Sequence, residues 1–163
     1  MSTEFLSPPT LPPPVGYSHV AKVNKGTLIY LAGQVSSDPS GTLIGEGNFE
    51  AQAEQVFRNL KIAVEAAGGT MADIVKLNIY LVAEVDQGSV PKLRAIRDRY
   101  VNVAQPPAST LVVVSRLARP GWLIEIEAVA AIDARNRNGA REGRRFVEGT
   151  ILVVPANAGT HTA

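Results

Sequence analysis

The stretch NFEAQAEQVFRNLKIAVEAAGG, residues 48–69, constrains the fold more than any other part of the chain. Its apolar residues recur at steps of three and four, which predicts an α-helix with one apolar stripe. Asn48 fits the N-cap position, and Gly68 fits a C-terminal stop. The next segment, residues 73–83, alternates apolar and polar residues as a strand with one buried face does. A helix and a strand of this kind predict a layered domain in which the helix covers a sheet.

The remaining elements extend this unit into an α+β fold. Residues 18–24 and 27–33 predict a hairpin in which Gly26 adopts the positive φ of a tight turn. A second helix is predicted over about residues 89–101. The segment PPASTLVVVSRLARPGWLIEIEA, residues 106–128, predicts the last two strands. The predicted order is therefore β-β-α-β-α-β-β.

Two amphipathic helices leave part of such a fold uncovered. They can cover only one face of a sheet of five or six strands. The strand in residues 106–114 also carries apolar residues at consecutive positions, so both of its faces are apolar. The second face of the sheet is therefore either exposed to solvent or buried against other subunits, and we expect an obligate oligomer.

Composition places one domain in the middle of the chain. A length of 163 residues allows one domain with a real core and is short for two. Residues 1–15 contain five prolines and predict an extended N-terminal arm, so the domain spans residues 16–133. Residues 134–163 begin with a cluster of five arginines and are interpreted as a flexible extension. The cluster could touch RNA or an acidic partner, but a solvated tail is the simpler interpretation.

The residue counts exclude several classes of site and partner. The chain has no cysteine and only two histidines, which removes disulfides, thiol nucleophiles and cysteine-based zinc sites and argues against a histidine metal cage. The formal net charge of +1 argues against a dedicated nucleic-acid binder. There is no signal-peptide pattern and no apolar stretch of the roughly 20 residues that a membrane span needs. We expect a cytoplasmic protein with no metal and no membrane partner.

Two groups of charged residues are candidates for function. On the second helix, Lys92, Arg94, Arg97 and Arg99 form a basic face. A solvated helix surface is the simpler interpretation of this face, and nucleic-acid binding is the other. Glu125 and Glu127 share one face of a strand because they are two residues apart. They either line the polar side of the sheet or, in the case of Glu125, face a cleft where a carboxylate can move a proton or hold a water.

Three segments together resemble the Rid (YjgF/RidA) family over about residues 14–132. They are VGYSHVAKV…LIYLAGQVS, AQAEQVFRNLKIAVEAAGGTMADIVKLNIYLV and PPASTLVVVSRLARPGWLIEIEAVA, in the family's order and spacing. The resemblance implies a chorismate-mutase-like α+β fold and a homotrimer, in which three sheets form a central barrel with three pockets between subunits. It implies hydrolysis of 2-imino or enamine acids to 2-keto acids and ammonia, without metal or cofactor. Some members carry the description endoribonuclease, which the near-neutral charge here does little to support.

The resemblance also assigns residues to the pocket. By position, Tyr17 matches the family's pocket tyrosine, Gly33 the backbone group beside the ligand, and Glu125 the carboxylate that positions water. Two positions depart from the family. Ser109 stands where deaminating members have an arginine, and Ala32 stands where many have a serine.

The serine at position 109 bears on the choice of function. An arginine there would hold a substrate carboxylate through two parallel hydrogen bonds. A serine has neither the positive charge nor the two parallel N–H donors. With Ser109 and Thr110 in the pocket, we expect a site that has lost its anion clamp. Two functions stay open. One is a Rid-type hydrolase or deaminase of imine, enamine or related carbonyl metabolites with altered specificity, and the other is a non-catalytic ligand-binding or regulatory trimer.

Overall fold

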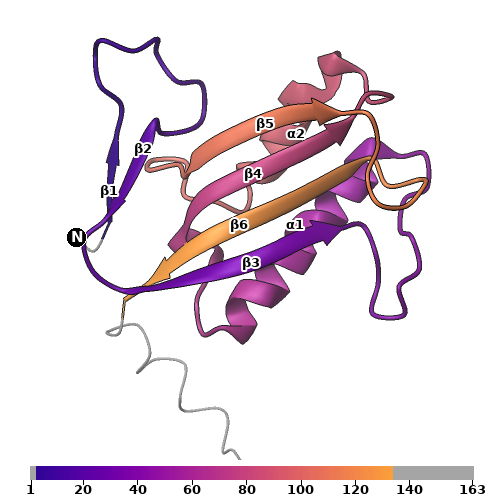
Figure 1. Cartoon of the computed structure of the whole chain (residues 1–163), viewed down its shortest axis with the longest axis horizontal. Coiled ribbons are helices and arrows are strands. Elements are labelled where there is room, and N and C mark those ends of the chain that lie inside the picture. The colour runs from indigo at the N-terminus through magenta and orange to yellow at the C-terminus, as the bar shows by residue number, and fades with distance from the viewer. Residues whose placement is uncertain (1–2, 134–163) are drawn as a thin grey trace, which may run out of the picture.

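The computed structural model describes residues 3–133 (Figure 1). In chain order its elements are β1 (Thr3–Leu6), β2 (Val20–Val23), β3 (Thr27–Val35), α1 (Phe49–Ala66), β4 (Ile74–Val82), α2 (Val90–Arg97), β5 (Ala108–Val114) and β6 (Ile124–Ile132), with short 3₁₀ turns before β4 and α2. The order from β2 to β6 is the predicted one, and the α+β class is confirmed. The basic extension predicted for residues 134–163 lies outside the described residues.

Four strands form the main sheet in the order β3-β6-β4-β5. β4 and β5 are parallel, because α2 crosses between them, and the other neighbours are antiparallel, so the sheet is mixed. Both helices lie behind the sheet, and the face toward the viewer of Figure 1 carries no helix. Two helices on one face of the sheet are what the sequence predicts.

The predicted hairpin between residues 18–24 and 27–33 is wrong. β2 pairs with β1 instead, so that Thr3 lies opposite Val23, and β3 pairs with β6. Gly26 does have a positive φ of 119°, but a Cβ there would lie 2.9 Å from the carbonyl oxygen of Ile132. The glycine therefore lets the chain pass close to the end of β6 rather than close a hairpin. As a result the main sheet has four strands, not five or six.

Local signals fix α1 and β4 as predicted. The Asn48 side chain accepts a hydrogen bond from the amide of Ala51 at 3.0 Å and caps α1. The central residues of the apolar stripe of α1 are fully buried, and in β4 the buried residues alternate with half-buried polar ones. The helices thus cover the face of β4 that carries Leu77 and Ile79, and Asn78 lies on the open face.

One buried polar side chain ties the loops to α1. Gln52 is fully buried, and its Nε2 donates to the carbonyl oxygens of Gly45 and Gly121 at 3.1 and 2.8 Å. Its Oε1 accepts from the amide of Leu123 at 2.9 Å. Because all of its hydrogen bonds go to backbone groups, this amide fixes the approach to β6 and so helps to place Glu125.

The open face of the sheet carries apolar side chains. Tyr30 is 76% exposed, and Leu28 and Val112 are exposed too. Tyr30 lies opposite Val129 in the sheet, and Val112 lies in one row with Tyr80. No helix within residues 3–133 is long and apolar enough to cross a membrane.

Candidate functional site

A pocket of about 430 Å³ lies where α2 faces the edge strand β5. Tyr17, Ser109 and Thr110, three of the residues assigned to the site from the sequence, line it. The other lining residues are Val15, Ile79, Val90, Leu93, Arg94, Arg97 and Leu111. The pocket therefore combines apolar side chains with the hydroxyl groups of Tyr17 and Ser109 and with two guanidinium groups on α2.

Tyr17 is held in the pocket by the residues that follow it. The amide of Ser18 donates to the carbonyl oxygen of Pro107 at 3.2 Å, and Ser18 forms a parallel bridge with Ala108 at the start of β5. The ring of His19 lies 5.4 Å from that of Tyr17 at 79°, and its Nε2 donates to the carbonyl oxygen of Pro12 at 2.9 Å. His19 thus supports the tyrosine and its loop.

Arg94 and Arg97 are the pocket residues that sequence reasoning missed. In the sequence they belong to a basic face for which a solvated surface is the simpler interpretation, yet the Arg97 side chain is only 8% exposed. Its Nε and Nη2 both donate to Oδ1 of Asp98, at 2.9 and 2.6 Å. A signal was present in the spacing, since Val90, Arg94 and Arg97 are four and three residues apart and share one stripe of the helix.

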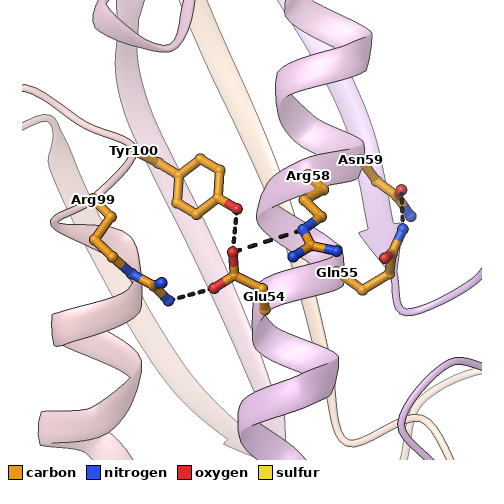
Figure 2. A network of polar contacts seen from close by, with 6 residues as sticks. All are labelled: Glu54, Gln55, Arg58, Asn59, Arg99 and Tyr100. Atoms are coloured by element: carbon orange, nitrogen blue, oxygen red, sulfur yellow. Dashed lines mark hydrogen bonds and ion pairs between the residues drawn. The ribbon is translucent and has the colours of Figure 1, made fainter.

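The other cations of this region point toward α1 and are paired. Lys92 Nζ lies 2.6 Å from Glu50, and this hydrogen bond raises the pKa of Lys92. Arg99 pairs with Glu54, which also accepts a hydrogen bond from the hydroxyl of Tyr100 at 2.5 Å (Figure 2). Their role is to join the two helices.

Glu125 and Gly33 meet on the open face of the sheet. A Cβ at Gly33 would lie 2.0 Å from Oε1 of Glu125, so only glycine lets this carboxylate rest against β3. The pairing of β3 with β6 shifts register between Leu31 and Gln34, and this bulge brings Gly33 to the carboxylate. Ala32 lies in the same bulge and is exposed.

The two glutamates of β6 differ in their partners. Glu127 accepts hydrogen bonds from Asn78 Nδ2 at 2.6 Å and from the hydroxyl of Tyr80 at 3.1 Å. The second bond raises the pKa of Tyr80. Glu127 thus lines the polar side of the sheet, as predicted. Within residues 3–133 no side chain donates to Glu125, which is half-buried and free to bind another group.

The structure does not bring all the predicted site residues together in one chain. Ser109 lies opposite Leu77 on the helix-covered face, whereas Glu125 lies opposite Tyr80 on the open face. Gly33 is on the edge strand β3, three strand spacings or roughly 14 Å across the sheet from β5. The predicted site residues therefore fall into two groups, a pocket half with Tyr17 and Ser109 and a carboxylate half with Gly33 and Glu125.

Neither half resembles a metal centre. The described residues contain no group of three or more histidine, cysteine, aspartate and glutamate side chains that could hold a metal ion. What the two halves do offer is one unpaired carboxylate, hydroxyl groups and two guanidinium groups around an apolar pocket. That set can bind a small polar molecule and direct a water to it.

Comparisons with known proteins cover most of the described residues. A family model described as endoribonuclease L-PSP matches residues 10–132. A RutC family protein of Pyrococcus abyssi is 35% identical over 131 residues, 80% of this chain and 98% of that protein. The 2-iminobutanoate/2-iminopropanoate deaminase of Dermatophagoides farinae is 32% identical, over 79% of this chain and 96% of that protein. The crystal structure of the Rid-family protein YyfB of Yersinia pestis, of unknown function, matches with a TM-score of 0.71 at 33% identity, over 81% of this chain and 100% of that one.

Proposed function

The chain belongs to the Rid family, which the endoribonuclease L-PSP model matches, and we propose that it is a small-molecule hydrolase of that family. Its substrates are imine, enamine or related carbonyl metabolites, and the reaction is a deamination. The relative from Dermatophagoides farinae bears the name of such a deaminase. The departures at Ser109 and Ala32, one in each half of the site, give the enzyme an altered specificity.

The observation that carries this proposal is the free carboxylate of Glu125 against Gly33. In hydrolysis of an imine, this carboxylate accepts a proton from water while the water oxygen bonds to the carbon of the C=N group. Glu125 passes that proton to the nitrogen, which takes up a second proton from the new hydroxyl group as the C–N bond breaks and the C=O bond forms, so the products are a carbonyl compound and ammonia. Tyr17 and the backbone at Gly33 bind the substrate and orient it.

We further propose that the two halves of the site come from different subunits of a homotrimer. Within one chain the sheet separates Ser109 from Glu125, so a second copy must supply one half. The exposed apolar residues of the open face, Tyr30 and Val112 among them, provide a surface for that copy. Light scattering should give a mass of roughly 52 kDa, three chains of 17.3 kDa. A monodisperse monomer at micromolar concentration would contradict both the trimer and the shared site.

The test of the reaction uses the two glutamates of β6 as a matched pair. The substrate is 2-iminopropanoate, generated in situ by a dehydratase, and the measurement is ammonia release above a no-enzyme control. Glu125→Gln should lower the rate at least about 100-fold, because the water loses its base. Glu127→Gln should stay within about threefold, since a glutamine oxygen still accepts from Asn78.

Two results would count against the hydrolase. If Glu125→Gln were as fast as the wild type, the carboxylate would have no part in the reaction. If the wild type bound small ligands but released no ammonia, the chain would be the non-catalytic ligand-binding trimer that the substitution at Ser109 also allows.

A further inference from the structure

Of the four cations on α2 and in the turn after it, three have a carboxylate partner among the described residues. Lys92 pairs with Glu50, Arg99 with Glu54, and Arg97 with Asp98. Among the described residues Arg94 has no carboxylate partner, although it is half-buried. An arginine in that position usually has a counter-ion, because a partly buried charge without one is costly.

The pocket beside Arg94 contains no acidic residue that could serve as its counter-ion. Its lining includes two arginines and no aspartate or glutamate. The Asp98 carboxylate offsets the charge of Arg97, so the guanidinium group of Arg94 leaves the pocket positively charged. Within residues 3–133 of one chain no group neutralises this charge, and a bound anion would complete the site.

The two arginines are also held in place. Gly16 has a φ of +74°, and a Cβ there would lie 2.5 Å from Nη2 of Arg97 and 3.3 Å from Cδ of Arg94. The backbone before Tyr17 therefore packs directly on both side chains. Side chains restricted before binding lose less entropy when a ligand arrives, which favours affinity.

From these contacts we propose that Arg94, supported by Arg97, binds the carboxylate of the substrate in place of an arginine at position 109. A guanidinium group offers two parallel N–H donors that match the two oxygens of a carboxylate. The ligands are then small 2-imino or 2-oxo monocarboxylic acids whose apolar part lies against Ile79 and Leu111. This replaces the expectation of a pocket without an anion clamp, and for the reaction it rests on the proposed function.

The positive charge in this pocket comes from a different secondary-structure element than in the family pattern. Ser109 is on β5, whereas Arg94 is on α2, which faces β5 across the pocket. A carboxylate held from the helix leaves the Ser109 hydroxyl to contact other parts of the ligand. The same acid would thus lie in another orientation, which accounts for an altered specificity.

The test is a binding measurement that needs no turnover. Isothermal titration calorimetry at neutral pH and low salt would use 2-oxobutanoate, its neutral methyl ester and inorganic phosphate as probes. The variants are Arg94→Ala, Arg94→Lys and, as a control for charge, Lys92→Ala, whose partner Glu50 is on α1 and outside the pocket. Thermal unfolding of each variant checks that the fold is kept.

We expect the wild type to bind 2-oxobutanoate and to bind the ester at least about tenfold more weakly. Arg94→Ala should lower the affinity for 2-oxobutanoate at least about 30-fold. The affinity of Arg94→Lys for 2-oxobutanoate should fall between those of the wild type and Arg94→Ala, because lysine keeps the positive charge but lacks the two parallel N–H donors. Lys92→Ala should stay within about threefold.

Several results would overturn the inference. They are unchanged affinity in Arg94→Ala, no detectable binding of 2-oxobutanoate by the wild type, and phosphate binding as tight as that of 2-oxobutanoate. Failure of this inference and of the proposed function can be told apart. Binding through Arg94 without any ammonia release supports the carboxylate site and contradicts the hydrolase. Ammonia release that is unaffected in Arg94→Ala supports the hydrolase and contradicts the carboxylate site.

Discussion

The two flanks of α2 differ in what their cations contact. On the flank toward α1, and in the turn that follows α2, Lys92 and Arg99 each meet a carboxylate from α1. Figure 2 shows the centre of this region, where Glu54 contacts Arg58, Arg99 and Tyr100. On the flank toward β5, Arg94 lines the pocket, and no carboxylate of residues 3–133 reaches it.

This difference shows that the cations of one basic helix face need not all serve the same function. The ring of Tyr100 stacks on Phe57 at 5.3 Å, so the α1 flank combines ion pairs with packing and serves stability. The pocket flank has the same residue types but directs them into a cavity of about 430 Å³. Changes on the first flank should alter stability alone, and changes on the second should alter ligand binding.

Gly16→Ala crowds the pocket flank and should have a larger effect on ligand binding than any change on the α1 flank. The new Cβ must displace Arg97 Nη2, which lies within 2.5 Å of its position, and affinity for 2-oxobutanoate should fall at least about tenfold. Gly41→Ala is the matched control, since Gly41 has a φ of +83° with nothing within 4 Å of an added Cβ. Both variants should lose about 1–2 kcal/mol of unfolding free energy from the positive φ. Equal affinities in the two would show that the contact with Arg97 does not matter.

On the other flank, Glu54→Ala should cost stability and leave binding unchanged. It removes the acceptor of the Tyr100 hydroxyl and the partner of Arg99, and Glu54 itself is only 23% exposed. We expect a loss of about 1.5–3 kcal/mol in urea unfolding. A drop in affinity for 2-oxobutanoate comparable to that of Arg94→Ala would show that the two flanks are not independent.

Tyr100, which donates a hydrogen bond to Glu54, makes the stability of the folded protein fall as the pH rises in the alkaline range. Burial first, and then the hydrogen bond to Glu54, raise the pKa of Tyr100 above its ordinary value of 10.0. A folded-state pKa that is raised stabilises the protein below pH 10.0, and this contribution is lost as the pH rises through the folded value. Tyr100→Phe should therefore flatten the decline of the melting temperature above pH 10.0 relative to the wild type. An identical decline in both would contradict this assignment.

The smallest effect is expected for Lys92→Ala. The Lys92–Glu50 pair is more than half exposed on both sides, and exposed ion pairs contribute about 0–1 kcal/mol. The melting temperature should shift by no more than a few degrees, and added salt should reduce the difference from the wild type. A larger loss would mean that this pair stabilises the contact between α1 and α2 as strongly as Glu54 does.

The sequence predicted the parts of the fold that depend on local signals. The α1 stripe with its Asn48 cap and the alternation in β4 follow from neighbours along the chain. The hairpin at Gly26 was wrong because strand pairing is decided at long range, and the partner of β2 is β1, in the segment interpreted as an arm. The buried Gln52 was missed because nothing near it in sequence reveals its contact with Gly121.

The site shows the same limit. Family resemblance assigned Tyr17, Gly33, Ser109 and Glu125 to one pocket. In the chain Tyr17 and Ser109 lie in one pocket, and Glu125 lies against Gly33 on the open face of the sheet. The resemblance could not show whether a carboxylate reaches each cation of α2, because Glu50 and Glu54 lie more than 40 residues away in the chain. The role proposed for Arg94 therefore depends on the tertiary structure.

The central claim is that one working site takes its pocket half and its carboxylate half from different subunits. Tyr17→Ala damages the first half and Glu125→Gln the second, and each variant alone should release little ammonia from 2-iminopropanoate. Subunits of the two variants, unfolded together in equal amounts and refolded, should form mixed trimers in which about a quarter of the sites are intact. The account predicts recovery of about a quarter of wild-type activity. A mixture no more active than the separate variants would contradict it, because both halves would then belong to one chain.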